Sequence, residues 1–272
     1  MAEKLTPAKV EEAVKHYENI QSGKTPILKT DKEKTTEHIT DLHRHLKKKD
    51  NKTFPLIPPT DPRLLMRIAE FSDDMLKEFE MKDRKELSQK MYDSMTKYGG
   101  IGLSCNQVGL PFRMFVMGGH QQIENGKVRN CFNPLIKDFS TETINMKEGC
   151  LSFPFLFLMI NRPKWVNVEY TDENGEKVEE YLHGMSARIF QHENEHMNGY
   201  IFTDLVSKMK LDRGKKAQAK LIKQTIRRQQ QRLRDEVASK NVKIYAVLSY
   251  TDSSKTVPSG GYKTVFPPKN QN

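Results

Sequence analysis

The stretch QHENEHMNG, residues 191–199, holds the side chains of this sequence best suited to chemistry: two histidines four residues apart, with a glutamate directly after the first. On a helix, residues i and i+4 lie on one face, one turn apart. His192 and His196 can therefore bind a single metal ion, with Glu193 beside it as a base. The competing interpretation is an ordinary helix on which two surface histidines flank salt-bridged glutamates.

A metal site of this kind needs a third protein ligand, and the residues leave more than one candidate. In zinc peptidases this ligand is often a downstream Glu or His. No histidine follows His196, and no spacing favours the acidic candidates Asp204 and Glu236. Upstream, EGCLS at residues 148–152 offers Cys150, whose thiolate is a strong ligand for a first-row metal.

A third motif, GIGLSCNQVG at residues 100–109, places three glycines around Gln107. Such a pattern indicates backbone packed close to a ligand. The alternative interpretations are an ordinary tight turn and a nucleotide-binding loop. The second is disfavoured, because neither GxxxxGK[ST] nor a strand–GxGxxG–helix unit is present. The alternative for Cys150 is a buried structural cysteine, the fate we expect for Cys105 and Cys131.

Length and composition predict one sizeable core with polar extensions, since the chain has 272 residues and its mean hydropathy is −0.73. Three cysteines give no disulfide framework. We find no apolar run of transmembrane length, no secretory leader and no typical transit peptide. These features predict a reducing, cytoplasmic setting without a membrane partner, and we take a monomer as the default.

The elements that must position these side chains are short strands followed by a central helix, which is typical of the α+β class. EGCLS is expected to place Cys150 in a small turn. The patterns predict a helix at about 73–98 ended by Gly99 and Gly100, a strand at 113–118, a hairpin of 165–170 with 177–182, and a helix over 184–200.

The two ends of the chain differ from this centre. Residues 1–55 form a polar extension with thin helical patterns. Residues 208–240 form a helical segment with twelve Lys/Arg and three Asp/Glu, a net charge of +9 out of +10 for the chain. This helix is either a solvated face or an RNA-binding element. We expect residues 241–272 to be mostly a flexible tail, in which 242–250 could add a strand.

The three motifs, in this order, resemble those of the peptide deformylases, which carry G-φ-G-L-A-A-x-Q-V-G, E-G-C-L-S and Q-H-E-x-D-H. The similarity extends to DPRL at 61–64, NP at 133–134 and NRP at 161–163, and covers roughly residues 56–207. This range is the expected catalytic domain. The resemblance implies antiparallel strands wrapped around the central helix.

The sequence departs from the family pattern at a few positions. Ser104 and Cys105 replace the usual alanines, and Glu195 stands where the family usually has Asp. Residues 153–163, FPFLFLMINRP, are more apolar than usual and lack the common Pro-Gly. These changes concern the shape of the substrate pocket more than catalysis.

The resemblance implies metal-dependent amide hydrolysis that removes the formyl group from the N-terminal formyl-methionine of nascent proteins and releases formate. It implies Cys150, His192 and His196 as metal ligands and Glu193 as the base. The family commonly uses Fe²⁺, and Zn²⁺, Ni²⁺ or Co²⁺ can replace it.

The resemblance also assigns the remaining site residues. The Gln107 side-chain amide and the backbone N–H of Leu151 would stabilise the oxyanion, and Glu148 and Arg162 would be structural supports and charge partners. The residues implied to lie along the substrate are Gly100, Ile101, Gly102, Ile189 and Phe190, of which Phe190 could be purely structural.

The implied partners are nascent N-formylmethionyl peptides and, through residues 208–240, the ribosome. Two rival hypotheses remain, a zinc peptidase and a non-enzymatic RNA-binding protein. The EGCLS motif and Gln107 argue against the first, because a peptidase needs neither. The intact set of ligands and base argues against the second. A bacterial, phage or organellar origin is compatible with the sequence.

Overall fold

The computed structural model describes residues 52–250, so the helical patterns expected in the N-terminal extension and the end of the tail lie outside the described residues. The helices and strands are α3 (Asp74–Glu78), α4 (Arg84–Lys97), β1 (Gly102–Ser104), β2 (Met114–Gly118), β3 (Val128–Phe139), β4 (Thr143–Cys150), β5 (Phe153–Pro163), β6 (Trp165–Thr171), β7 (Lys177–His183), α5 (Gly184–Met197) and α6 (Lys208–Tyr250). Four short 3-10 helices complete the list: Pro62–Leu65, Cys105–Val108, Glu124–Gly126 and Phe202–Leu205.

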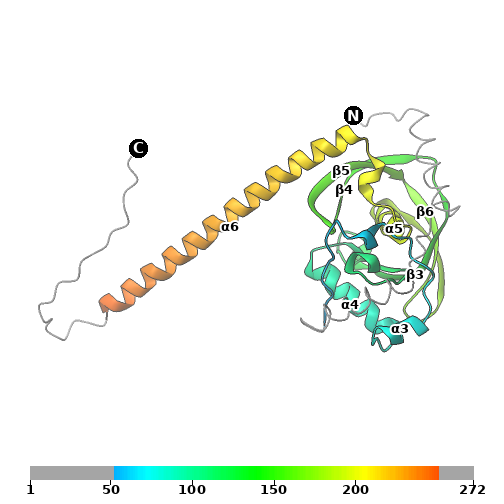
Figure 1. Cartoon of the computed structure of the whole chain (residues 1–272), viewed down its shortest axis with the longest axis horizontal. Coiled ribbons are helices and arrows are strands. Elements are labelled where there is room, and N and C mark those ends of the chain that lie inside the picture. Colours follow the sequence, from blue (N-terminus) through cyan, green and yellow to red (C-terminus); the bar gives the residue numbers. More distant parts are fainter. Residues whose placement is uncertain (1–51, 251–272) are drawn as a thin grey trace, which may run out of the picture. The chain divides into compact units, whose positions relative to one another are not determined.

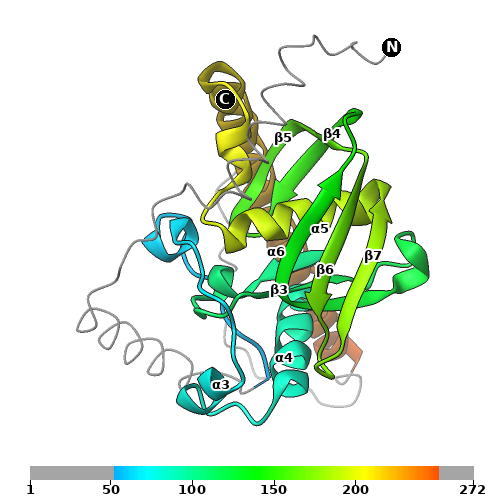
Figure 2. The same ribbon diagram turned by 90° about the vertical axis from the view of Figure 1, so that its right-hand side faces the viewer.

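The strands form two antiparallel sheets around α5. One sheet has the order β1-β2-β3-β6-β7, and β4 and β5 pair as a separate ribbon. Figures 1 and 2 show α5 lying between the strands, and it packs against strands of both sheets. This arrangement confirms the predicted α+β class. It also leaves β1 at an edge of its sheet.

The central helix α5 is buried on all sides. Every residue from Ser186 to Met197 is buried, including the polar ones. A helix buried all round belongs to the core of the molecule. Its polar side chains are therefore expected to have partners, since an unpaired buried polar group is costly.

The helix expected at 73–98 is two helices, and the single-helix prediction was wrong. Glu80, between α3 and α4, has a φ of 55°, which a continuous right-handed helix does not allow. A new helix begins after Asp83, whose carboxylate accepts the backbone N–H of Glu86. The predicted stop is confirmed, because Gly99 follows α4 with a φ of 70°.

Further predictions were correct in type but not always in extent. The strand at 113–118 and the hairpin are confirmed as β2, β6 and β7. The helix over 184–200 ends earlier, at Met197. The expectation that Cys150 lies in a turn was wrong. Residues 148–150 continue the antiparallel pairing with β5, so Cys150 is the last residue of β4. Residues 242–250 continue α6, so the alternative of a strand there was wrong.

The described residues up to Ala219 belong to one compact unit, and those from Lys220 to a second. The first turns of α6 pack on β5: the Gln218 amide donates to the carbonyl of Pro154 at 2.8 Å. Gly214 lies so close to Leu158 that a Cβ would be 2.6 Å from it. Between residues 52 and 250, none of the helices combines the length and the apolar character that crossing a membrane requires.

Candidate metal centre

The two histidines of the first motif lie one turn apart on α5, with ring centroids 5.1 Å apart. Both side chains are buried, His192 at 7% and His196 at 1% exposure. Burial and, to a smaller extent, the charge of His192 together lower the pKa of His196 from 6.5 to about 3. His196 is therefore neutral near pH 7, which is the form that binds metals.

Strand β4 brings Cys150 to these histidines from 46 residues away in the sequence. Its Sγ lies 3.3 Å from Nε2 of His196. The ligand atoms of Cys150, His192 and His196 all lie within 4.8 Å of one another. Two ligands at about 2.1 Å and 2.3 Å from one tetrahedral ion are roughly 3.6 Å apart. The three side chains therefore fit a metal ion.

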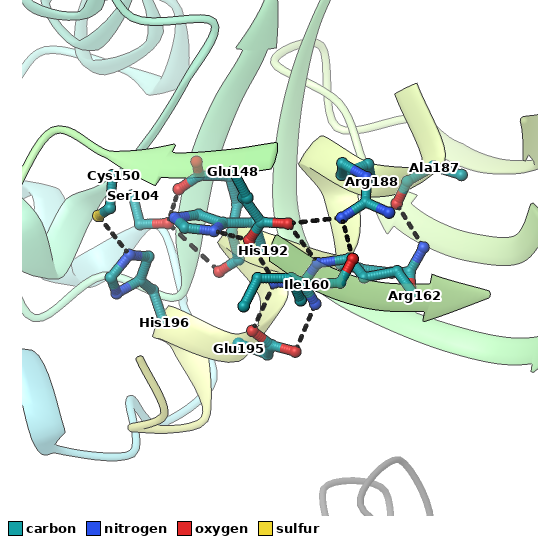
Figure 3. A network of polar contacts seen from close by, with 12 residues as sticks. Ser104, Glu148, Cys150, Ile160, Arg162, Ala187, Arg188, His192, Glu195 and His196 are labelled. Atoms are coloured by element: carbon teal, nitrogen blue, oxygen red, sulfur yellow. Dashed lines mark hydrogen bonds and ion pairs between the residues drawn. The ribbon is translucent and has the colours of Figure 1, made fainter. Parts of the chain in front are cut away.

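A buried carboxylate orients His192 from behind. Oε1 of Glu148 lies 2.6 Å from Nδ1 of His192, which leaves Nε2 for a ligand (Figure 3). Burial lowers the pKa of His192, but its hydrogen bonds with Cys150 and Glu148 outweigh this and raise it overall, so a metal ion would bind here by displacing the Nε2 proton. A carboxylate on the far nitrogen of a ligating histidine fixes the ring and its tautomer.

Glu148 in turn contacts two buried arginines. Arg162 donates to it from Nε at 2.8 Å and from Nη2 at 2.6 Å, and Arg188 donates from Nη1 at 2.9 Å. Burial alone would raise the pKa of Glu148, but the charge and hydrogen bonds of Arg162 hold it well below its usual range. Glu148 is therefore ionised near neutral pH, and the expectation that it pairs with Arg162 is confirmed.

Arg162 also contacts Glu195 on α5, at 2.6 Å from Nη1 and 2.9 Å from Nη2. The cluster of two arginines and two glutamates is therefore neutral as a whole, which a buried set of charges requires. Figure 3 shows this cluster on the side of His192 away from Cys150. It ties β4, β5 and α5 together behind the candidate ligands.

The glutamate of the first motif, Glu193, faces Ser104 of β1. The Ser104 hydroxyl donates to Oε2 of Glu193 at 2.5 Å. Burial raises the pKa of Glu193, and the charge of His192 opposes this. A Cβ on Gly102 would collide with the Glu193 carboxylate, so β1 approaches this side chain as closely as a glycine permits.

Gln107 directs its side-chain amide at the cysteine. Its Nε2 donates to Sγ of Cys150 at 3.3 Å and to Oγ of Ser152 at 3.0 Å, while its Oε1 accepts the backbone N–H of Ser104 at 2.8 Å. The amide is thus held at both ends. Leu151, next to Cys150, packs its side chain so close to Gly100 that a Cβ there would be 2.6 Å away.

A cavity of about 820 Å³ opens beside these residues. Most of the residues implied by the resemblance line it: Gly100, Ile101, Gly102, Cys150, Leu151, Ile189, His192 and Glu193. Gln107, His196 and Phe190 do not line it. The side chain of Phe190 is fully buried against Phe115, with ring centroids 5.1 Å apart, and is therefore structural.

Sequence reasoning gave no role to three side chains that the structure brings to the site. Ser104 contacts the motif glutamate, Ser152 contacts Gln107, and Arg188 contacts Glu148. Arg188 could have been found, because it precedes His192 by four residues and so shares its helix face. The two serines carry no such signal, since their partners are distant in the sequence.

The fold and this site define a metal-dependent hydrolase: a buried HExxH helix, a cysteine from a separate strand, and a carboxylate beside an apolar cavity. The profile of the family described as "Polypeptide deformylase" matches residues 61–212. A peptide deformylase of Thermotoga sp. (strain RQ2) is 40% identical over 153 residues, which cover 55% of this chain and 85% of that protein.

A chloroplastic/mitochondrial peptide deformylase 1B of Arabidopsis thaliana is 37% identical over 153 residues, 54% of this chain and 56% of the plant protein. The crystal structure of peptide deformylase from Ehrlichia chaffeensis superposes with a TM-score of 0.55 at 31% identity, covering 64% of this chain and 99% of that one. This chain belongs to the polypeptide deformylase family, whose members are metal-dependent hydrolases that remove formyl groups.

Proposed function

We propose that this chain removes the formyl group from N-terminal formyl-methionine with Cys150, His192 and His196 as metal ligands and Glu193 as the general base. The observation that carries the proposal is the 3.3 Å approach of the Cys150 thiol to His196 at the cavity that Glu193 also lines. A bound divalent ion would supply Lewis acidity and make water more acidic.

Glu193 performs the proton transfers in this proposal. Its carboxylate takes a proton from the attacking water and gives it to the amine that leaves. Ser104 keeps the carboxylate oriented through its hydrogen bond. The products are formate and a free amino terminus.

Gln107 and the backbone N–H of Leu151 stabilise the negative charge that develops on the formyl oxygen. The Gln107 amide is already held by Ser104 and Ser152, so it needs little reorganisation during the reaction. Removal of one such donor typically costs about 100-fold or more in rate. Gln107→Ala is therefore expected to lower kcat more than it changes KM.

The peptide binds along β1 in this proposal. Because β1 is an edge strand, its free backbone groups can pair with an extended peptide next to residues 100–102. The side chain of Ile189 and the backbone of Gly102 then form the wall beside the methionine side chain.

We propose Fe²⁺ as the native metal, with Zn²⁺, Ni²⁺ or Co²⁺ as replacements. A thiolate softens the Lewis acidity of the ion and suits Fe²⁺, which binds less tightly than Zn²⁺ in the general affinity order. Since Cys150 must stay reduced, we place the protein in a reducing compartment such as the cytoplasm. Elemental analysis of protein purified without oxygen tests the metal, and cell fractionation tests the compartment.

For the ends of the chain we propose separate roles. Residues 56–207 are the catalytic domain, residues 1–55 a polar extension, and 241–272 mostly a tail. The net charge of +9 on residues 208–240 supports binding to ribosomal RNA near the emerging substrate. Ribosome pelleting with and without residues 208–272 tests this, and equal pelleting of both forms would refute it. Light scattering tests the proposed monomer.

The test of the catalytic proposal is formate release from a formyl-methionyl tripeptide by protein purified without oxygen. We expect formate from the wild type and almost none from Glu193→Ala. The exposed Glu176 provides the matched control, since Glu176→Ala removes a carboxylate far from α5 on the β6–β7 turn. An active Glu193→Ala protein would refute the assignment of the base.

A further inference from the structure

One face of β5 exposes a row of large apolar side chains. Phe155, Phe157 and Met159 are 42%, 45% and 49% exposed, while Leu156 and Leu158 between them are buried. Single exposed apolar residues are normal, but a contiguous row of them is unusual and indicates contact with a ligand. The row belongs to residues 153–163, the strongly apolar segment FPFLFLMINRP.

Two of the three side chains in this row line the catalytic cavity. Phe155 and Phe157 belong to the lining of the 820 Å³ cavity together with Cys150 and Glu193, whereas Met159 does not. The apolar row is therefore continuous with the proposed site of reaction. A peptide whose formyl group lies at Cys150 would extend its following residues toward this part of the cavity.

The ring of Phe157 has a fixed place next to the metal centre. Phe157 pairs with Gly149 across the β4–β5 ribbon, and a Cβ on Gly149 would lie 2.8 Å from the ring. The ring therefore packs directly on the backbone of Gly149, which precedes Cys150 and has no side chain. The ammonium of Lys147 lies over the ring, 4.6 Å from its centroid.

Phe155 is held in an unusual backbone conformation. Its φ is 64°, in the left-handed region that strains a residue with a Cβ. The preceding carbonyl, that of Pro154, accepts the hydrogen bond from Gln218 of α6. Packing of α6 on the other face of β5 thus supports a conformation that keeps Phe155 at the cavity.

We propose that Phe155, Phe157 and Lys147 form a specificity wall. These side chains contact the residues that follow the formyl-methionine of the substrate and select among them. The two rings favour a large apolar or aromatic side chain at the second or third position, because they can bury it. The ammonium of Lys147 disfavours a basic side chain there. This inference rests on the proposed function, since it assigns a substrate preference to that site.

The experiment measures kcat/KM for formate release from formyl-Met-X-Ser and formyl-Met-Ser-X peptides, with X as Phe, Leu, Gly, Lys or Glu, on the metal-loaded full chain. We expect the wild type to prefer Phe and Leu over Gly by about 10-fold at one of the two positions. Phe157→Ala should lose most of this preference. Met159→Ala, on the same face of the same strand, should keep it.

Lys147→Glu supplies a second variant that leaves the rings in place. It should raise kcat/KM for X as Lys relative to X as Glu by about 10-fold. If Phe157→Ala does not fold by circular dichroism, Phe157→Leu and Lys147→Glu decide the question. Equal kcat/KM for all peptides, or a preference that survives both variants, would overturn the inference while the proposed function stands. Absence of formate from every peptide would instead overturn the proposed function.

Discussion

Replacement of Arg162 by Met should strongly destabilise the protein. The Arg162 side chain is 0% exposed and is shared between two buried carboxylates, Glu148 and Glu195. Removal of one partner from a buried ion pair costs about 3–5 kcal/mol. Glu148 would keep its contact with Arg188 at 2.9 Å, whereas Glu195 would lose both bonds from the guanidinium. We therefore expect the cost of breaking one buried ion pair, Arg162 with Glu195, about 3–5 kcal/mol, rather than twice that amount.

Thermal unfolding followed by circular dichroism measures this effect. For a domain of this size, a loss of about 3–5 kcal/mol lowers Tm by roughly 6–20 °C. Adding Glu195→Gln to Arg162→Met removes the buried negative charge that Arg162 balances in the wild type and should recover at least half of the loss. The control is Lys164→Met, which breaks the exposed pair of Lys164 with Glu142, 49% and 72% exposed, and should leave Tm nearly unchanged.

Two outcomes would refute the reasoning about Arg162. One is a single variant within about 1 kcal/mol of the wild type, because breaking a buried ion pair costs more than that. The other is a double variant no more stable than the single one, which would mean that the unbalanced charge of Glu195 is not the cause of the loss.

Three further predictions follow from the site and the sheet. Gly102→Ala should lower kcat by about 100-fold or more, because the new Cβ displaces the Glu193 carboxylate; activity near that of the wild type would contradict the close approach of β1. Acid should destabilise the fold through Glu180. Burial alone would raise the pKa of this carboxyl, but Arg129 lowers it from its ordinary value of 4.5 to about 2. The stabilisation from the ionised carboxylate is therefore full above pH 4.5 and is lost as the pH falls toward 2. Glu180→Gln should flatten the decline of Tm in that window, and an unchanged slope would contradict the assignment. Chelation should lower the Tm of the metal-loaded protein, by the equivalent of about 2.7 kcal/mol when the free metal had been at 100 times its Kd. The same treatment should leave the Tm of Cys150→Ala almost unchanged. An equal fall of Tm in both proteins would show that chelation acts at another site.

The catalytic segment on the helix could be predicted from the sequence because its geometry is local. His192 and His196 lie one turn apart wherever residues 191–199 are helical. The β6–β7 hairpin followed from the same kind of local signal, a turn between two alternating runs. The α+β class followed from the order of these elements. The family resemblance then selected Cys150, which no local rule could rank above Asp204.

The strands that complete the site had no comparable signal. The sequence of β4 neither alternates regularly between apolar and polar residues nor is uniformly apolar, and it carries Glu148 and Cys150 at its end. It therefore lacks the pattern that identifies a strand. The split between α3 and α4 was missed for a related reason. A continuous helical pattern does not reveal a residue such as Glu80, which takes a left-handed conformation between two helices.

The sequence by itself determined the chemistry that is available: two histidines and a base on one helix face, a cysteine in EGCLS, and a glutamine among glycines. Their meeting was decided only by the tertiary structure, because the contact of Gln107 with Cys150 spans 43 residues of sequence and that of Cys150 with His196 spans 46. Folding places β4 beside α5 so that Cys150 reaches His196, and it surrounds Arg162 with two carboxylates. It also turns the unusual apolar segment into a wall of the cavity. Long-range packing decides which face of a strand meets the site, and no local spacing encodes that choice.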